Sequence, residues 1–528
     1  MSSDERYDAI VVGAGHNGLV HACYLAKAGL NTLLLERRDL VGGAAITEEV
    51  VPGFKFTTFS YAMSLVRPEI VHDLDLVRHG MMVLPMVKTF QPGLNGEYLL
   101  LGSDADANYH EIARHSSADA EAARDLDHII ARLVRALKPW VDRIPPNSLS
   151  KDPADIAEMA ELRGWFRELD EDVRGMLETF RTKSAAEILD EYFENELVKS
   201  LYVSSGIIGS RCSVRDRESG LVWLFHKLGE YDGEPAHWGF HKGGNGGFTQ
   251  VLARAFEAFG GKVRLNAGVS ELLYEDARAH GVKLEDGTLL ESDLVVSALD
   301  PRQTFLGLVD PGDLPDDLAG RIEDFKFQGT AAKVNFALKD VPSFPGLEGR
   351  EDIFTGFTNL GPSIDYYMDA WADCEAGRIS TRPFLDCCIQ STLDPDMAPP
   401  GKHVMSCFVM YAPYHLAEGD WDSERDRLGD TVQETIEEFF PGFGELILHR
   451  EIVTPLDIEN LIGLSEGNIF AGELFEDQLF LNRPAPGWNQ YRTPIEGYYQ
   501  CGSGTHPGGC VTGAPGWLAA RQVLKDRG

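Results

Sequence analysis

The feature that most constrains this chain is a glycine loop near its start. Three glycines stand at GxGxxG spacing directly after an apolar run: Gly13, Gly15 and Gly18. The run predicts a buried strand at 9–12, residues 19–30 have helix-compatible apolar spacing, and 32–35 predict a second buried strand followed by Glu36. This order, complete in about 30 residues, is typical of a unit in which helix N-terminal amides bind a pyrophosphate and the acid binds a ribose. The unit predicts an α/β fold of Rossmann type that binds a dinucleotide.

A second glycine pair decides which dinucleotide is expected. Gly42 and Gly43 follow Glu36 at the spacing E-x5-G-G. This run resembles the extended FAD fingerprint of the glutathione reductase type, in the branch that holds the flavin amine oxidases and the phytoene desaturase-like oxidoreductases. The resemblance implies FAD as cofactor, with Glu36 and Arg38 at the adenosine end and the glycine pair near the pyrophosphate.

Ala44 separates the two groups in that branch. Flavin amine oxidases usually continue the glycine pair with arginine, whereas this chain has Ala44. We therefore favour the phytoene desaturase-like (phytoene dehydrogenase-related) group, which includes the pyridine nucleotide-disulphide oxidoreductase domain-containing relatives. A disulfide reductase needs a redox cysteine pair and a nicotinamide domain. The sequence shows neither.

The middle of the chain supplies another expected cofactor segment. "EDGT", within 285–288, is a hairpin signal, and 294–299 predict a buried strand. In the resembled families this region contacts adenine through backbone, which maps to Val269. The glycine cluster 243–247 is not expected to be a second dinucleotide loop, because no buried strand is predicted immediately before it.

The last forty residues resemble the C-terminal flavin motif of the phytoene desaturase-like group. A strand, a glycine-rich turn and a final helix are expected, and the helix start would direct amides and a positive dipole at the flavin. The residues assigned to the cofactor here are Gly502, Gly504, Val511 and Thr512. Cys510 is predicted to pack as a small side chain, with a redox or covalent role as the alternative. His506 is the candidate catalytic residue, with a histidine bonded to backbone in a tight turn as the alternative.

Composition excludes several classes of function. Acidic residues outnumber basic ones 83 to 48, for a net charge of -35, which disfavours nucleic acid as a partner. The chain begins without a secretory signal and contains no apolar stretch long enough to span a bilayer, so we expect a soluble cytoplasmic protein without stable membrane insertion. Eight scattered cysteines predict neither a disulfide framework nor a metal site.

Two long insertions divide the expected FAD-binding domain. Helical stripes such as 117–141 predict a mainly helical first insertion, and mixed strands and helices predict an α+β second one. The expected parts are 1–75 for the first FAD-binding part, 76–235 for a helical lid and substrate insertion, 236–301 for the second FAD-binding part, 302–470 for the substrate domain, and 471–528 for the C-terminal FAD-binding part.

Three functions remain open from the sequence. The first is an FAD-dependent oxidoreductase that desaturates, saturates or isomerises a carbon-carbon bond in an apolar, polyene or isoprenoid-like substrate, as the resemblance implies. The second is an amine oxidase or C-N dehydrogenase, and the third is a flavin-binding assembly protein with little turnover. The substrate is expected to be a small molecule or lipid-like compound, and the oligomeric state is not predicted.

Overall fold

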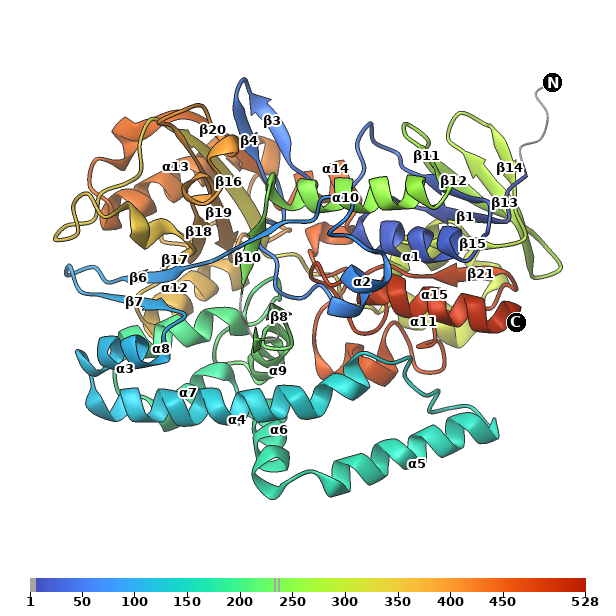
Figure 1. Cartoon of the computed structure of the whole chain (residues 1–528), viewed down its shortest axis with the longest axis horizontal. Helices are drawn as coiled ribbons and strands as arrows, with labels where there is room; N and C mark the ends of the chain where they lie inside the picture. Colours follow the sequence, from blue (N-terminus) through green and yellow to red (C-terminus); the bar gives the residue numbers. More distant parts are fainter. Residues whose placement is uncertain (1–5, 232–233, 236–237) are drawn as a thin grey trace.

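A parallel sheet forms the nucleotide-binding part of the protein (Figure 1). The computed structural model describes residues 6–231, 234–235 and 238–528. The sheet has five strands in the order β11-β2-β1-β15-β21. Their bounds are Ala9–Val12 for β1, Thr32–Leu35 for β2, Lys262–Arg264 for β11, Val295–Ser297 for β15 and Tyr498–Gln500 for β21. β1 and β2 are aliphatic and wholly buried, as strands covered on both faces must be, and both were predicted from sequence.

Helices cover one face of this sheet, and a small antiparallel sheet covers the other. The helices are α1 (His16–Lys27), α10 (Gly244–Ala258) and α15 (Ala514–Arg527). The antiparallel sheet consists of β12 (Val269–Glu275), β13 (Arg278–Leu284) and β14 (Leu289–Glu291). β13 and β14 form the hairpin predicted from "EDGT", with Gly287 at a positive φ of 85°. The α/β, Rossmann-type fold expected from the sequence is therefore confirmed, although three widely separated segments build it.

A mixed seven-stranded sheet forms the second region, in the order β20-β16-β19-β18-β17-β6-β7. Its strands are β6 (Lys88–Pro92), β7 (Tyr98–Gly102), β16 (Ala331–Leu338), β17 (Phe357–Leu360), β18 (Leu385–Cys388), β19 (His403–Met410) and β20 (Ile447–Val453). Alternate residues of β16 face opposite sides, so Val334 and Phe336 pack in an apolar cluster with α13 (Trp421–Phe439). Lys333 and Asn335 lie on the other side of β16.

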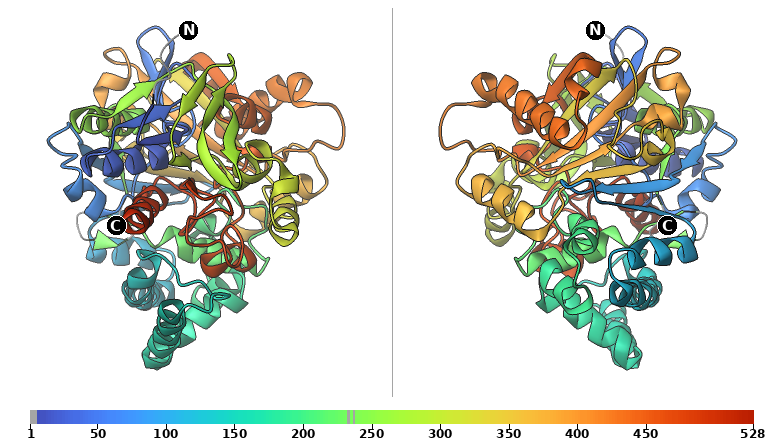
Figure 2. Two further views of the ribbon diagram at one scale, coloured as in Figure 1. Left: turned by 90° about the vertical axis from the view of Figure 1, so that its right-hand side faces the viewer. Right: turned by 90° about the vertical axis from the view of Figure 1, so that its left-hand side faces the viewer.

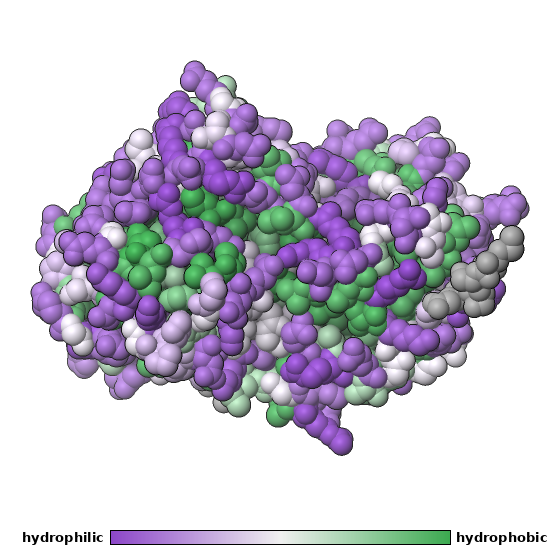
Figure 3. All heavy atoms as spheres, turned by 90° about the horizontal axis from the view of Figure 1, so that it is seen from above, coloured by the Kyte–Doolittle hydropathy of each residue, from purple (hydrophilic) through white to green (hydrophobic). Residues whose placement is uncertain are grey.

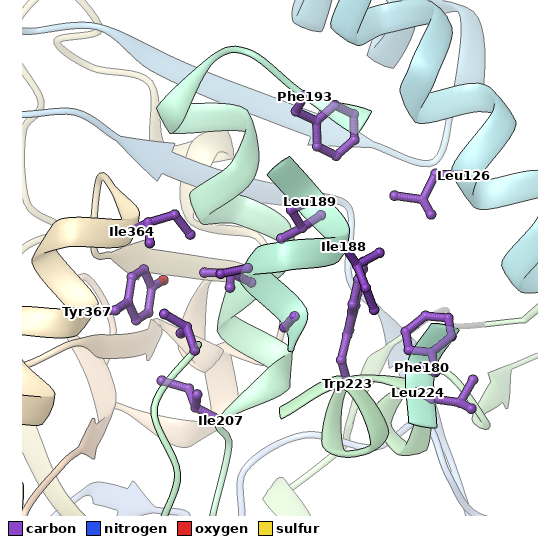
Figure 4. Close-up of a cluster of buried hydrophobic side chains, with 14 of the residues drawn as sticks. Leu126, Phe180, Ile188, Leu189, Phe193, Ile207, Trp223, Leu224, Ile364 and Tyr367 are labelled. Carbon is purple, nitrogen blue, oxygen red and sulfur yellow. The ribbon is translucent and has the colours of Figure 1, made fainter. Parts of the chain in front are cut away.

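Helices that follow β7 in the chain make the third region, which lies at the bottom of both views in Figure 2. They are α3 (Ala105–Ala113), α4 (Ser117–Val141), α5 (Pro153–Glu168), α6 (Glu171–Thr182), α7 (Ala185–Tyr192), α8 (Glu196–Val203) and α9 (Glu218–His226). Figure 4 shows Leu126, Phe180 and Trp223 gathered from three of these helices into one apolar cluster. The cluster reaches Tyr367 of α12 (Ile364–Glu375), which joins the helical region to the seven-stranded sheet.

Short elements connect these regions. They are β3 (Glu48–Val51), β4 (Phe54–Phe56), α2 (Pro68–Asp73), β5 (Val83–Pro85), β8 (Glu230–Tyr231), β9 (Glu234–Pro235), β10 (Gly239–His241), α11 (Asp316–Glu323) and α14 (Pro455–Ile462). β10 corrects one sequence expectation, because it is a buried strand just before the glycine cluster 243–247. It pairs antiparallel with β5, outside the parallel sheet. The glycines that follow β10 therefore lie in a different setting from the loop after β1.

The surface mixes polar and apolar residues. Figure 3 shows hydrophilic side chains around several hydrophobic patches on the face seen from above. Among the described residues, no helix combines the length and hydropathy that a bilayer crossing requires.

Candidate active site

One cavity of about 580 Å³ extends through the three regions. We call its part along the loops after β1 and β2 the nucleotide end, which is lined by Gly13, Gly15, Glu36, Arg38 and Val269. We call its part along the seven-stranded sheet and the helical region the substrate end, which is lined by Tyr61, His226, Lys333, Asp386 and Phe408. Gly18, Gly43, Ser503, Cys510 and Val511 also line the cavity.

The backbone of the glycine loop packs closely on itself and lines the cavity. A Cβ on Gly18 would lie 2.1 Å from the carbonyl oxygen of Gly13, and one on Gly43 would lie 3.1 Å from Cα of Gly15. Gly15 has no protein atom within 4 Å of an added Cβ, so its open side faces the cavity. The start of α1 thus presents unobstructed amides and a positive dipole to a bound pyrophosphate.

Glu36 is held rigidly at the end of β2. Its Oε2 accepts a hydrogen bond from the Ala14 amide at 2.9 Å, and its Oε1 accepts one from the Arg38 amide at 3.0 Å. Arg38 forms an ion pair with Glu48 at 2.7 Å. A buried carboxylate fixed in this way suits the two hydroxyls of a ribose, because each oxygen can accept a further hydrogen bond.

Buried polar atoms along the cavity test whether the site fits FAD. In the described part of the chain, several lack a protein partner: His16 Nε2, Asn17 Oδ1, Arg38 Nη1 and Ser64 Oγ. They lie at the expected adenosine end, at the start of α1 and on the segment after β4. Native proteins rarely leave buried polar groups unpaired. The residues present therefore fit FAD, and Val269, which the resemblance assigns to adenine, lines the nucleotide end of the cavity.

Some residues of the C-terminal motif line the same cavity, and others pack behind those residues without reaching it. Ser503 accepts a hydrogen bond from Asn17 Nδ2 at 3.0 Å, which fixes the turn against α1. Gly502, Gly504 and Thr512 do not line the cavity. The two glycines allow close packing, because a Cβ on Gly504 would lie 2.1 Å from Pro301. Gly42 is likewise behind the lining, where its amide donates to the Ala14 carbonyl at 2.8 Å.

His506 faces away from the cavity. It is 2% exposed, and its Nε2 donates to the Val141 carbonyl at the end of α4, at 2.9 Å. Burial lowers the pKa of His506 to about 4. The structure thus shows the backbone-bonded histidine that the sequence left open, and it places no part of His506 on the cavity wall. A role in aligning the C-terminal turn against α4 fits this position better than contact with substrate.

A buried arginine joins the loops beside the flavin motif. The Arg483 guanidinium donates to five backbone carbonyls, those of Phe470, Gly472, Glu473, Gln478 and Ser503. Phe470 and Ser503 line the cavity. Burial lowers the pKa of Arg483 to about 9, so that the side chain is still charged at neutral pH. The Arg483 side chain therefore fixes the loop of Phe470 and the loop of Ser503 relative to each other.

Three ionisable side chains meet at the substrate end. The Tyr61 hydroxyl donates to Asp386 Oδ2 at 2.9 Å, and Lys333 Nζ lies 4.0 Å from the centre of the Tyr61 ring. Lys333 also donates to Ser406. Burial lowers the pKa of Lys333 to about 8 and raises that of Asp386 to about 7, so both groups can change charge near neutral pH.

His226 adds a fourth functional group, at the end of α9. Its Nδ1 lies 2.8 Å from the Val222 carbonyl, and its ring packs 5.8 Å from that of Phe470. A carbonyl oxygen can only accept, so Nδ1 carries the hydrogen and Nε2 presents a lone pair. Burial lowers the pKa of His226 to about 4, which keeps the ring neutral.

Sequence reasoning missed these substrate-end residues. They lie on separate segments, and no local pattern joins them. The available signal was a charged residue inside an apolar strand, as Lys333 is in "AAKVNFAL" and Asp386 is in "FLDCC". Lys and Asp are almost never fully buried without a specific role or partner, so such positions were identifiable as candidates.

Comparisons with known proteins agree with the geometry. The family described as flavin containing amine oxidoreductase matches residues 18–524. The protein of Mus musculus called pyridine nucleotide-disulfide oxidoreductase domain-containing protein 2 is 36% identical over 545 residues, covering 99% of this chain and 94% of its own. Phytoene desaturase (lycopene-forming) of Paracoccus sp. is 26% identical, covering 98% and 97%. The solved structure of a putrescine oxidase variant has a TM-score of 0.59 at 17% identity and covers 99% of both chains, which shows a shared fold.

Proposed function

Because the chain belongs to the flavin-containing amine oxidoreductase family, we propose that this FAD-dependent oxidoreductase acts on a carbon-carbon bond of a largely apolar, isoprenoid-like substrate, by desaturation, saturation or isomerisation. The observation that carries the proposal is the apolar wall of the substrate end. Phe357, Phe408, Ile208 and Ile469 line it, in one cavity with the flavin motif. The likeness to phytoene desaturase and the presence of Ala44 support the same reading. A phytoene desaturase-like specificity is part of this proposal.

The protein would contribute alignment and exclusion of water. FAD, when bound, supplies the acceptance or donation of a hydride. The aromatic rings of Tyr61, Phe357 and Phe408 form a connected cluster, with Tyr61 6.1 Å from each of the other two. Such a wall orients an apolar chain along the cavity and keeps the reacting carbon atoms dry.

Oxidation of a carbon-nitrogen bond is the second candidate. Asp386, a buried carboxylate, favours it because a carboxylate can bind an ammonium group. Ala44, where amine oxidases usually have arginine, speaks against it. A flavin-binding assembly protein would carry the same nucleotide end, and the absence of substrate-dependent flavin reduction would identify it.

Anaerobic reduction of the flavin tests the proposal. The FAD-loaded protein would be mixed with an isoprenoid hydrocarbon or isoprenoid alcohol, and in parallel with polyamines and aliphatic monoamines, while absorbance near ~450 nm is followed. We expect bleaching with isoprenoids. Bleaching with amines alone would replace the proposal by its second candidate. If neither class reduces the flavin, the dithionite-reduced protein should be reoxidised by a polyene, as saturation requires, and failure of that too would contradict desaturation, saturation and amine oxidation.

A further inference from the structure

Two hydrogen-bond acceptors at the substrate end have no partner in the described part of the protein. They are Asp386 Oδ1 and His226 Nε2, both buried and both on residues that line the cavity. They come from different regions, Asp386 from β18 of the seven-stranded sheet and His226 from α9 of the helical region. Two unpaired acceptors in one apolar cavity therefore constrain which polar groups its ligand carries.

The environment of Asp386 leaves one oxygen for a ligand. Oδ2 accepts the Tyr61 hydroxyl at 2.9 Å, while Oδ1 has no donor. Lys333 lies over the Tyr61 ring and donates to Ser406. Among the described residues, the contacts of Lys333 are with Ser406 and the Tyr61 ring, and none is an ion pair with Asp386. The carboxylate is therefore oriented by Tyr61 but is not neutralised by direct contact with a cation.

His226 offers an acceptor of fixed geometry. Its Nδ1 hydrogen is engaged by the Val222 carbonyl, so the imidazole cannot turn Nε2 into a donor without losing that hydrogen bond. The side chain is 5% exposed, and Phe470 packs against the ring. Like the ionised form of Asp386, it can satisfy its free atom only with a hydrogen-bond donor, such as one on the bound molecule.

These contacts argue against a pure hydrocarbon as substrate. A buried acceptor that is left without a donor costs about 1–3 kcal/mol, more when it is charged. A hydrocarbon filling the cavity would leave both atoms unpaired, whereas a ligand with a hydroxyl or amine would not. Resting on the proposed function, we infer that the substrate carries a hydrogen-bond donor, a hydroxyl or an amine, on its apolar body, and that Asp386 Oδ1 binds that donor.

Three matched probes test this inference without turnover. Farnesol, farnesylamine and farnesyl methyl ether share one apolar body, and the ether lacks the donor. Their dissociation constants for the FAD-loaded protein would be measured by calorimetry above the pKa of about 7 that burial gives Asp386, so that the carboxyl is ionised. We expect both donor probes to bind at least about tenfold more tightly than the ether, since a hydrogen bond to a charged group is worth more than one tenfold step. An advantage of the amine over the alcohol would identify the amine as the donor.

The variant Asp386→Asn assigns the effect to this residue. Asn lacks the charge of the carboxylate, and where the Tyr61 hydroxyl still donates to its oxygen, its amide nitrogen offers the cavity a donor in place of the acceptor of Asp386. The advantage of the donor probes over the ether should fall at least about tenfold. Asp369→Asn, at an exposed position of α12 in the same region, is the matched control and should change nothing.

Several outcomes would overturn the inference. They are equal affinity of the wild-type protein for all three probes, no binding of either donor probe up to its solubility, and an unchanged preference in Asp386→Asn. If Asp386→Asn fails to fold, the wild-type comparison decides alone. Failure of the proposed function is seen separately, because it appears when isoprenoids neither reduce nor reoxidise the flavin, and it leaves the order of probe affinities untouched.

Discussion

The two ends of the cavity recognise their ligands by different means. At the nucleotide end, backbone amides are the main binding groups, because glycines such as Gly15 and Gly18 leave them open to the cavity. At the substrate end, ionisable side chains such as Lys333 and Asp386 project from strands of the seven-stranded sheet. Relatives that share one cofactor can bind it through the same rigid backbone. Side chains at the substrate end can differ between relatives, and so can the substrate, without a change of fold. The comparison explains why the cofactor is easier to identify than the substrate.

Substitutions in the glycine loop should have the largest effect. Gly18→Ala places Cβ 2.1 Å from the Gly13 carbonyl oxygen, so we expect loss of the fold and of FAD together. Gly15→Ala has open space within the protein, so the apoprotein should fold while FAD affinity falls at least about 100-fold, because the methyl group would stand where the pyrophosphate approaches. Thermal unfolding and the ratio of flavin to protein absorbance would measure the two effects.

The matched control for both variants is Gly164→Ala. Gly164 lies in α5 with no atom within 4 Å of an added Cβ, so the substitution should leave flavin content unchanged and raise helix stability slightly. Full FAD content in Gly15→Ala would show that the backbone cradle is not the cofactor site, and the comparison between the two ends would fail.

Lys333 at the substrate end should lower the free energy of unfolding of the apoprotein, whereas the glycines of the nucleotide end are needed for folding. Its pKa is about 8 in the folded protein and 10.5 when exposed, so the folded state binds fewer protons than the unfolded state between these values. Stability of the wild-type apoprotein should therefore rise from pH 8 to pH 10.5 through this group. Lys333→Met lacks that slope, and it should be the more stable protein at pH 7, by on the order of 3 kcal/mol.

Unfolding in denaturant at several pH values would measure this difference. The gap between Lys333→Met and wild type should shrink as pH rises above 8, and titrating groups that Lys333 does not influence cancel because both proteins contain them. FAD affinity should change less than about threefold, since Lys333 is not at the nucleotide end. A gap that stays constant with pH would mean that Lys333 titrates normally and that the substrate end is well hydrated.

Glu36 is expected to have the next largest effect, confined to one part of the cofactor. Glu36→Gln removes the charge that would bind the ribose and weakens the hydrogen bonds from the Ala14 and Arg38 amides. We expect FAD and ADP-ribose to bind roughly 10- to 100-fold more weakly, since hydrogen bonds to charged groups contribute about 1.5–3 kcal/mol. Affinity for FMN, which lacks the adenosine ribose, should not change, and equal losses for FMN and ADP-ribose would contradict the assignment.

The same contrast explains what the sequence could predict. The unit from Ala9 to Glu36 is local, because strand, loop, helix and acid follow one another and their spacing alone fixes the geometry. The substrate end is not local. Tyr61, His226, Lys333 and Asp386 meet only because the seven-stranded sheet and the helical region pack on the nucleotide-binding part. His506 shows the limit most clearly, since it lies in the flavin motif by sequence, yet the end of α4 engages its ring.

Cys510 should have the smallest effect of the residues considered. Its thiol lies on the cavity wall beside the flavin motif, and burial raises its pKa to about 12. A protonated thiol is a poor nucleophile, so we expect FAD to be bound without a covalent bond. Acid precipitation should therefore release all the yellow colour into the supernatant, both for wild type and for Cys510→Ala. Stability should change by less than about 1 kcal/mol, because only one sulfur atom is lost, from a residue that is not fully buried. A yellow pellet from wild type but not from Cys510→Ala would instead show attachment at this thiol, and the flavin end of the cavity would then bind through a side chain as well as through its backbone.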